Sequence, residues 1–165
     1  MGLPNERVRV VYDCMVFLQG AARGDGPAGL CLMLAEKGFV ELCLSAAILD
    51  EVGDVLHRPR LRAKFPALTD ELVSQFLQTL SGFSTFFADV TRQLAFSRDP
   101  KDEPYINLAR VAKAQYLVSR DADLLDVPTS SDTDSRRVRE ECPGLEIMDP
   151  LTFLRSMRHL SPERS

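Results

Sequence analysis

A buried β-strand is predicted by the run Val8-Arg9-Val10-Val11-Tyr12-Asp13, in which β-branched residues dominate. The run ends at a carboxylate, and a carboxylate at the end of a buried segment needs a partner. Further strands are predicted at residues 40–44, 115–119 and 145–148, and the second of these is followed closely by Asp121. The segment 83–90 fits either a strand or a passage from helix to strand.

The segments between these strands carry helical signals. Helices are predicted at residues 27–37, 45–57, 69–80, 104–114 and 149–157, and a short charged helix at 136–141. Residues 20–29 are predicted to be a glycine-rich connection, and the pair Arg58-Pro59 to end the helix before it. Alternating strands and helices predict an α/β fold with a central parallel sheet covered on both faces. Right-handed crossovers then bring the carboxyl ends of the strands to one edge, where ligands bind in such folds.

Composition limits the class of protein. The 165 residues, 45% of them hydrophobic, predict a single domain spanning residues 1–165 with frayed termini. No stretch approaches the ~18 apolar residues that cross a bilayer, and no signal sequence is recognised, so we expect a cytoplasmic protein with no membrane partner. The four cysteines have neither C-x-x-C nor zinc-site spacing, which predicts reduced packing residues.

Six carboxylates occupy positions that such a fold would gather. They are Asp13, Glu51, Asp102, Glu103, Asp121 and Asp123. Three of them end or follow strands, whereas the other three lie on helices beside the same sheet edge. Crowded carboxylates repel one another, and Mg²⁺ or Mn²⁺ is the compensation that suits hard oxygen ligands. Two such ions about 4 Å apart can generate hydroxide and stabilise the leaving oxygen of a phosphodiester. The pattern therefore predicts a metal-dependent nuclease.

Each acid also has a plain structural interpretation. Asp102 or Glu103 could cap the following helix, Asp121 could cap a short turn, and Glu51 alone could be a solvated helix residue. The joint pattern is better evidence than any single acid. Gly24 to Gly29 match G-x-G-x-x-G, but the strand ends about ten residues earlier, which disfavours a dinucleotide site.

The overall charge gives little information on a nucleic-acid partner. The formal net charge is −4, which neither indicates nor excludes such a partner, because local patches and metal ions can invert the field. One basic run is a candidate for binding RNA phosphates, and it contains Arg58, Arg60, Arg62 and Lys64. A solvated helix end explains the same run equally well.

Five segments together resemble a known family. They are residues 10–13, 44–61, 98–109, 116–125 and 147–154, of which the most telling contains Arg98-Asp99-Pro100-Lys101-Asp102-Glu103-Pro104. On these segments the chain resembles the PIN-domain ribonucleases, and within them the VapC-like branch of toxin components of toxin–antitoxin pairs. The likeness covers roughly residues 8–155, which would form the core of the domain.

The resemblance implies a three-layer α/β/α PIN-like fold and cleavage of single-stranded RNA that depends on Mg²⁺ or Mn²⁺. It also implies a homodimer and a small antitoxin protein as partners. Asp13 would be the first-strand metal ligand, Glu51 the helix acid and Asp121 the fourth acid. Glu103 would take the third acidic position, with Asp102 beside it as a substitute, and Asp123 would assist.

The chain departs from the family at the end of the first strand. The family usually has Asp-Thr-Asn there, whereas this chain has Asp13-Cys14-Met15. A thioether cannot replace the donor and acceptor of the missing amide, although Gln19 is close enough in sequence to offer one. The departure supports an alternative function, that of a catalytically weakened PIN module that acts by binding RNA or protein.

Overall fold

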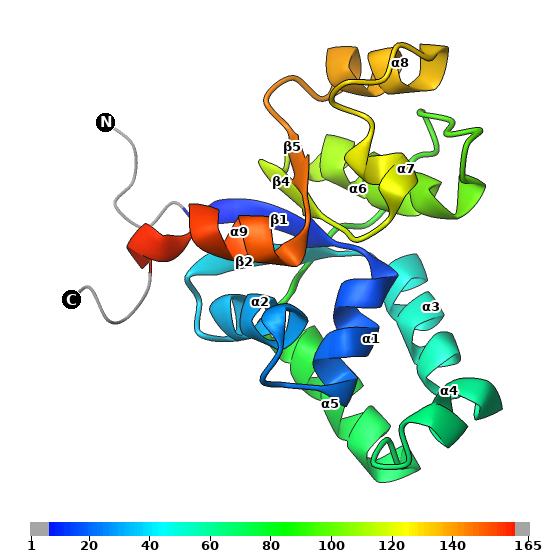
Figure 1. Cartoon of the computed structure of the whole chain (residues 1–165), viewed down its shortest axis with the longest axis vertical. Helices are drawn as coiled ribbons and strands as arrows, with labels where there is room; N and C mark the ends of the chain where they lie inside the picture. Colours follow the sequence, from blue (N-terminus) through cyan, green and yellow to red (C-terminus); the bar gives the residue numbers. More distant parts are fainter. Residues whose placement is uncertain (1–6, 161–165) are drawn as a thin grey trace.

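A five-stranded, all-parallel sheet forms the centre of the protein, which is described here from a computed structural model (Figure 1). The structure describes residues 7–160, and the tail expected to fray, residues 161–165, lies outside this range. The strand order is β3-β2-β1-β4-β5. The strands are β1 (Val8–Tyr12), β2 (Val40–Leu44), β3 (Thr85–Phe86), β4 (Tyr116–Val118) and β5 (Glu146–Met148). The predicted α/β class with a parallel sheet is therefore confirmed.

Helices cover both faces of this sheet. They are α1 (Cys14–Ala22), α2 (Pro27–Glu36), α3 (Ala46–Leu56), α4 (Pro59–Lys64), α5 (Asp70–Phe83), α6 (Glu103–Ala112), α7 (Ala122–Leu125), α8 (Thr133–Glu141) and α9 (Pro150–Ser156), with 3₁₀ turns η1 (Pro100–Asp102) and η2 (Arg158–Leu160). Figure 1 shows α6 on the opposite side of β1 and β2 from α2. Among the described residues, no helix is long and apolar enough to cross a membrane.

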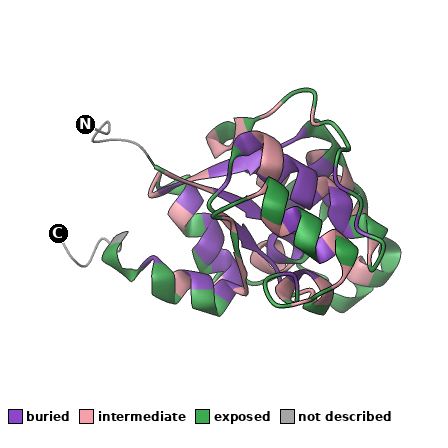
Figure 2. Cartoon of the chain, turned by 90° about the horizontal axis from the view of Figure 1, so that it is seen from above, coloured by how far each residue is buried: buried purple, intermediate pink, exposed green. Residues whose placement is uncertain are grey.

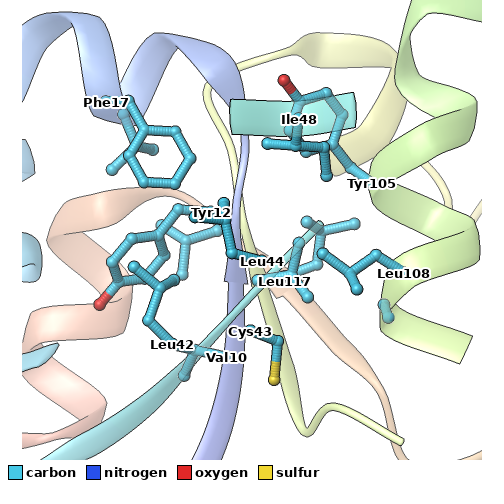
Figure 3. Packing of buried hydrophobic residues seen from close by; sticks show 14 of the residues in the cluster. Val10, Tyr12, Phe17, Leu42, Cys43, Leu44, Ile48, Tyr105, Leu108 and Leu117 are labelled. Atoms are coloured by element: carbon cyan, nitrogen blue, oxygen red, sulfur yellow. The ribbon is translucent and has the colours of Figure 1, made fainter. Parts of the chain in front are cut away.

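The core is built by the alternation of side chains along the strands. Tyr12 is fully buried, and its hydroxyl donates to the Cys31 carbonyl of α2 at 2.7 Å. Leu108 of α6 is fully buried with Leu117 of β4, on the other side of the sheet from Tyr12 (Figure 3). Buried residues lie on the strands and the inner faces of the helices, and exposed ones on the outer faces (Figure 2). The sheet therefore carries two hydrophobic layers, one on each face.

Two helices differ from the sequence-based prediction. The glycine-rich connection is shorter than expected because α1 occupies residues 14–22. This helix buries the consecutive residues Val16, Phe17 and Leu18, so it lacks the polar face that produces a helical hydrophobic period. Pro59 was expected to end a helix, but it also begins α4. Its missing N–H is not a disadvantage there, because the first N–H of a helix has no partner within the helix.

Side-chain caps make sharp turns at the edge where the strands end. Asp13 caps α1 directly after β1, and Ser45 caps α3 directly after β2. Asp121 caps α7 shortly after β4. Each cap oxygen accepts a backbone N–H of the first helical turn, which would otherwise lack a partner. These turns hold the residues that follow β1 and β4 next to each other.

Gly29 provides a first prediction, because it sits where two backbone segments touch. A Cβ at this position would lie 2.2 Å from the Gly24 carbonyl oxygen. Alanine in a helix normally stabilises the fold by up to about 1 kcal/mol relative to glycine. Here the added methyl group would collide with the backbone of Gly24, which cannot move aside as a flexible side chain could. We therefore expect Gly29→Ala to lower the free energy of unfolding by about 1–3 kcal/mol in urea denaturation.

Gly24→Ala is the matched control, because nothing lies within 4 Å of its Cβ position. Its effect should stay within about 0.5 kcal/mol. Equal stability of the two variants would contradict the close approach of Gly24 to α2.

Candidate metal and active site

Asp13 lies at the centre of the edge where β1 and β4 end. Its backbone N–H donates to the Val118 carbonyl of β4 at 3.1 Å. One carboxylate oxygen accepts the Val16 N–H at 3.2 Å, and the other accepts the hydroxyl of Ser119. The residue is only 4% exposed. Asp13 is therefore tied to both strands and held in one orientation.

A pocket of about 340 Å³ opens at this edge and collects acids from distant parts of the chain. Four of the six acids chosen from the sequence line it, namely Asp13, Glu51, Asp102 and Asp121. Glu51 is held by Tyr105, whose hydroxyl donates to one of its carboxylate oxygens at 2.8 Å. The predicted convergence of acids from β1, α3, η1 and the β4–α7 connection is therefore present.

Two of the six acids, Asp123 and Glu103, do not line this pocket, and the surroundings of Glu103 are the more different. The Glu103 carboxylate accepts Arg92 Nε at 2.5 Å and the Phe96 N–H at 3.0 Å, and the ion pair lowers its pKa. It lines a different pocket of about 580 Å³ instead. The structure thus places Asp102, the substitute named from the sequence, in the acidic pocket and Glu103 in the other one, because consecutive residues at a helix start point about 100° apart.

Asp102 takes the place inside the acidic pocket. It is 6% exposed, and its Oδ2 is buried without a hydrogen-bond partner among the described residues. Burial raises the pKa of Asp102 to about 8, and the charges of Asp121 and Asp99 act in the same direction. Burial also raises the pKa of Asp13, against hydrogen bonds that lower it. These carboxylates lack a compensating charge.

The donor set fits a divalent cation. Two cationic side chains, Lys101 and Arg120, line the pocket, but neither forms an ion pair with an acid in the described part of the chain. The unpartnered Asp102 oxygen and the surrounding carboxylate oxygens are hard ligands of the type that Mg²⁺ and Mn²⁺ prefer. A bound cation would neutralise the repulsion that raises the pKa of Asp102.

Asp99 and Ser119 are site residues that sequence reasoning missed. One carboxylate oxygen each from Asp99, Asp121 and Asp123 lies within 4.8 Å of the others, and Asp123 also pairs with Arg98 at 2.9 Å. Asp99 is three residues before Asp102, a helical spacing that could have drawn attention to it. Ser119 is fully buried, and its oxygen accepts the Asp121 N–H at 2.9 Å while its hydroxyl donates to Asp13. No sequence signal distinguishes Ser119.

The basic run divides among several roles. Arg58 pairs with Asp54 at 3.4 Å, and Arg62 pairs with Asp70 at 2.9 Å. Arg60 is exposed, and Lys64 lines a third pocket, together with Gln19. Gln19 therefore does not line the acidic pocket as a substitute for the missing amide.

Met15, at the position of that amide, lines the acidic pocket and is 46% exposed. All four cysteines are free thiols, as the sequence predicts.

The raised pKa of Asp102 predicts a pH effect on stability in the absence of metal. The folded protein keeps this proton up to about pH 8, whereas an ordinary Asp with pKa 3.8 loses it in the unfolded chain. Between these values the unfolded state binds fewer protons, so stability falls as pH rises. We expect Tm in EDTA to fall less steeply over this range in Asp102→Asn than in the wild type. Parallel Tm profiles would contradict the burial of an unpaired carboxylate.

Comparison with known proteins agrees with the geometry. A family model described as PIN domain matches residues 9–123, a range that includes Asp13, Glu51, Asp102 and Asp121. None of the curated proteins compared matches the chain. No solved structure matches it either. PIN domains are generally nucleases, and the cluster of Asp99, Asp121 and Asp123 could hold a metal ion. With more than half of its length matched, the chain belongs to the PIN domain family.

Proposed function

We propose that the protein is an endoribonuclease that cleaves single-stranded RNA and depends on Mg²⁺ or Mn²⁺. The observation that carries this proposal is the meeting of Asp13, Glu51, Asp102 and Asp121 in one pocket. Four carboxylates with so little compensating charge are costly for folding alone. Membership of the PIN domain family supports phosphodiester hydrolysis as the reaction.

The roles of the side chains follow from their surroundings. Asp99, Asp121 and Asp123 have carboxylate oxygens within 4.8 Å of one another and would hold the metal, and Asp13 and Asp102, which line the pocket beside Asp121, would complete the ligand set. When bound, the cation supplies Lewis acidity for attack by water and for departure of the leaving oxygen.

The chain's own residues then orient the reacting groups. Ser119 fixes Asp13 and the backbone of Asp121 relative to each other. Glu51, which accepts a hydrogen bond from Tyr105, would accept a proton from water. Arg120, which lines the pocket, would contact the scissile phosphate.

The direct test is cleavage of a fluorescently labelled single-stranded RNA by the purified protein. We expect cleavage with Mn²⁺ or Mg²⁺, none in EDTA, and none by Asp13→Asn or Asp121→Asn with either metal. Circular dichroism should show that both variants remain folded. Cleavage that persists in EDTA or in both variants would refute the assignment, and the same sequence as DNA tests the preference for RNA.

The proposal extends to the VapC-like toxin role, with a small antitoxin and a homodimer as partners. Support for this role comes from the resemblance of the five sequence segments to that branch. If it is correct, induced expression should arrest bacterial growth, and expression of Asp121→Asn should not. Growth arrest by both proteins would reject a toxin role that acts through cleavage.

A second candidate, a PIN module that binds without cleaving, is favoured by Met15 in the pocket lining. Calorimetric titration with Mn²⁺ separates the two functions. Binding of Mn²⁺ together with RNA cleavage supports the nuclease, whereas no Mn²⁺ binding at millimolar concentration supports the non-catalytic module.

A further inference from the structure

A third pocket, of about 470 Å³, lies beside the acidic one and has the opposite character. Its polar lining includes Arg23, Lys64 and Arg120, which come from the end of α1, the end of α4 and the β4–α7 connection. No acidic residue lines it. Three cations that are far apart in the sequence thus share one concavity, which we call the basic pocket.

These three cations differ from most other basic residues near the site. Arg58, Arg62 and Arg98 each form an ion pair with an aspartate. In the part of the chain that the structure describes, no ion pair involves Arg23, Lys64 or Arg120. In a protein of net charge −4, unpaired cations that line one pocket indicate an anionic ligand.

The start of α2 adds to the same positive field. Gly26, Pro27 and Ala28 line the pocket, and Gly26 caps the helix without a side-chain hydrogen bond. The first N–H groups of this ten-residue helix therefore have no side-chain acceptor, and a helix N-terminus favours an anion. Phe65 also lines the pocket, and the Lys64 ammonium lies over its ring, 5.7 Å from the centroid.

Arg120 connects the basic pocket to the acidic one, because it lines both. A polyanion held in the basic pocket therefore continues past Arg120 toward Asp13 and Asp121. Inorganic phosphate would also pair with these cations, but it would leave the continuity between the basic and the acidic pocket unused.

We propose that the basic pocket binds a backbone phosphate of the single-stranded RNA whose neighbouring linkage enters the acidic pocket. The proposal rests on the ribonuclease function and deepens it by naming where the strand is held beyond the scissile bond. Charged side chains that neutralise phosphates dominate such binding and make it salt-dependent.

The test measures RNA binding in EDTA, where cleavage does not interfere, by fluorescence anisotropy of a labelled single strand. The double variant Arg23→Gln/Lys64→Gln leaves Arg120 and the acids intact. We expect its Kd to rise by roughly tenfold or more, as for removal of charged hydrogen bonds. Its salt slope, d log K/d log[salt], should become shallower by about 0.7 for each RNA phosphate that the variant no longer neutralises.

The matched control is Arg136→Gln/Arg137→Gln, which makes the same change in charge. Both arginines are exposed on α8, at the far end of the molecule from α4 (Figure 1), and line none of the three pockets. If the control variant and the test variant lose RNA affinity equally, the loss is a general effect of charge, and the assignment of the phosphate to the basic pocket is overturned. Unchanged Tm in both variants establishes that folding is not the cause.

Cleavage by the wild type in Mn²⁺ separates this proposal from the one on which it rests. If the wild type cleaves RNA and the pocket variant binds RNA normally, the proposed phosphate site is refuted, whereas the proposed ribonuclease function is supported. If the wild type does not cleave but the pocket variant alone loses affinity, the nuclease is wrong and the RNA-binding pocket is supported. Calorimetric loss of inorganic phosphate binding in the variant, with RNA affinity intact, would identify a free-anion site and overturn the strand proposal.

Discussion

Replacing Asp102 with Asn is expected to reduce metal-dependent RNA cleavage by more than about a hundredfold, beyond the 10–100-fold typical of residues that only orient metal ligands. The reason is the position of its carboxylate, buried in the acidic pocket with Oδ2 unpartnered among the described residues. Asn keeps the shape but removes the charge that a cation needs. Initial rates at saturating Mn²⁺ measure the effect, and calorimetry should show weaker Mn²⁺ binding.

Glu103→Gln is the matched control at the neighbouring position. Gln can still accept the Phe96 N–H, so the substitution removes only the ion pair with the exposed Arg92. We expect the rate to fall by less than about tenfold, below the range for a residue that orients metal ligands. An inactive Glu103→Gln protein beside an active Asp102→Asn protein would restore the order of preference drawn from the sequence.

Replacing Phe153 with Ala is expected to cost about 3–5 kcal/mol of unfolding free energy, the range for removal of a large buried aromatic ring. Phe153 is fully buried and joins α9 to the sheet. Its ring centroid lies 6.0 Å from that of Tyr12 and 5.4 Å from that of Tyr116, both with edge-to-face geometry. Urea denaturation at neutral pH measures the effect.

Leu151→Ala is the comparison for this change, because Leu151 lies on the same helix but is 49% exposed. It should alter the unfolding free energy by no more than about 0.5 kcal/mol. A Phe153→Ala protein as stable as Leu151→Ala would mean that α9 does not close the core on this face of the sheet.

Most of the fold could be predicted because its signals are local. The β-branched run before Asp13 and the capping residues Ser45, Thr69 and Asp149 mark the strand and helix starts where the structure has them. The helix α1 escaped prediction because its sequence is apolar except for Gln19 and has no period to detect. Its burial depends on neighbours, chiefly α2 and α3, that the local sequence does not reveal.

The sequence by itself determined the parallel α/β class and placed Asp13 and Asp121 at the ends of two strands, because strand propensity and strand ends are local properties. Only the tertiary structure shows that Asp102 lines the acidic pocket while Glu103 pairs with Arg92, since the direction of each side chain depends on how η1 and α6 pack against the sheet. The tertiary structure also gave different surroundings to the basic residues of the run 58–64. Arg58 and Arg62 form salt bridges, whereas Lys64, at the end of α4, lines a pocket with Arg23 and Arg120 from distant segments. The periodicity of a sequence shows which residues share one face of a helix or strand, but the packing of distant segments decides which side chains contact that face.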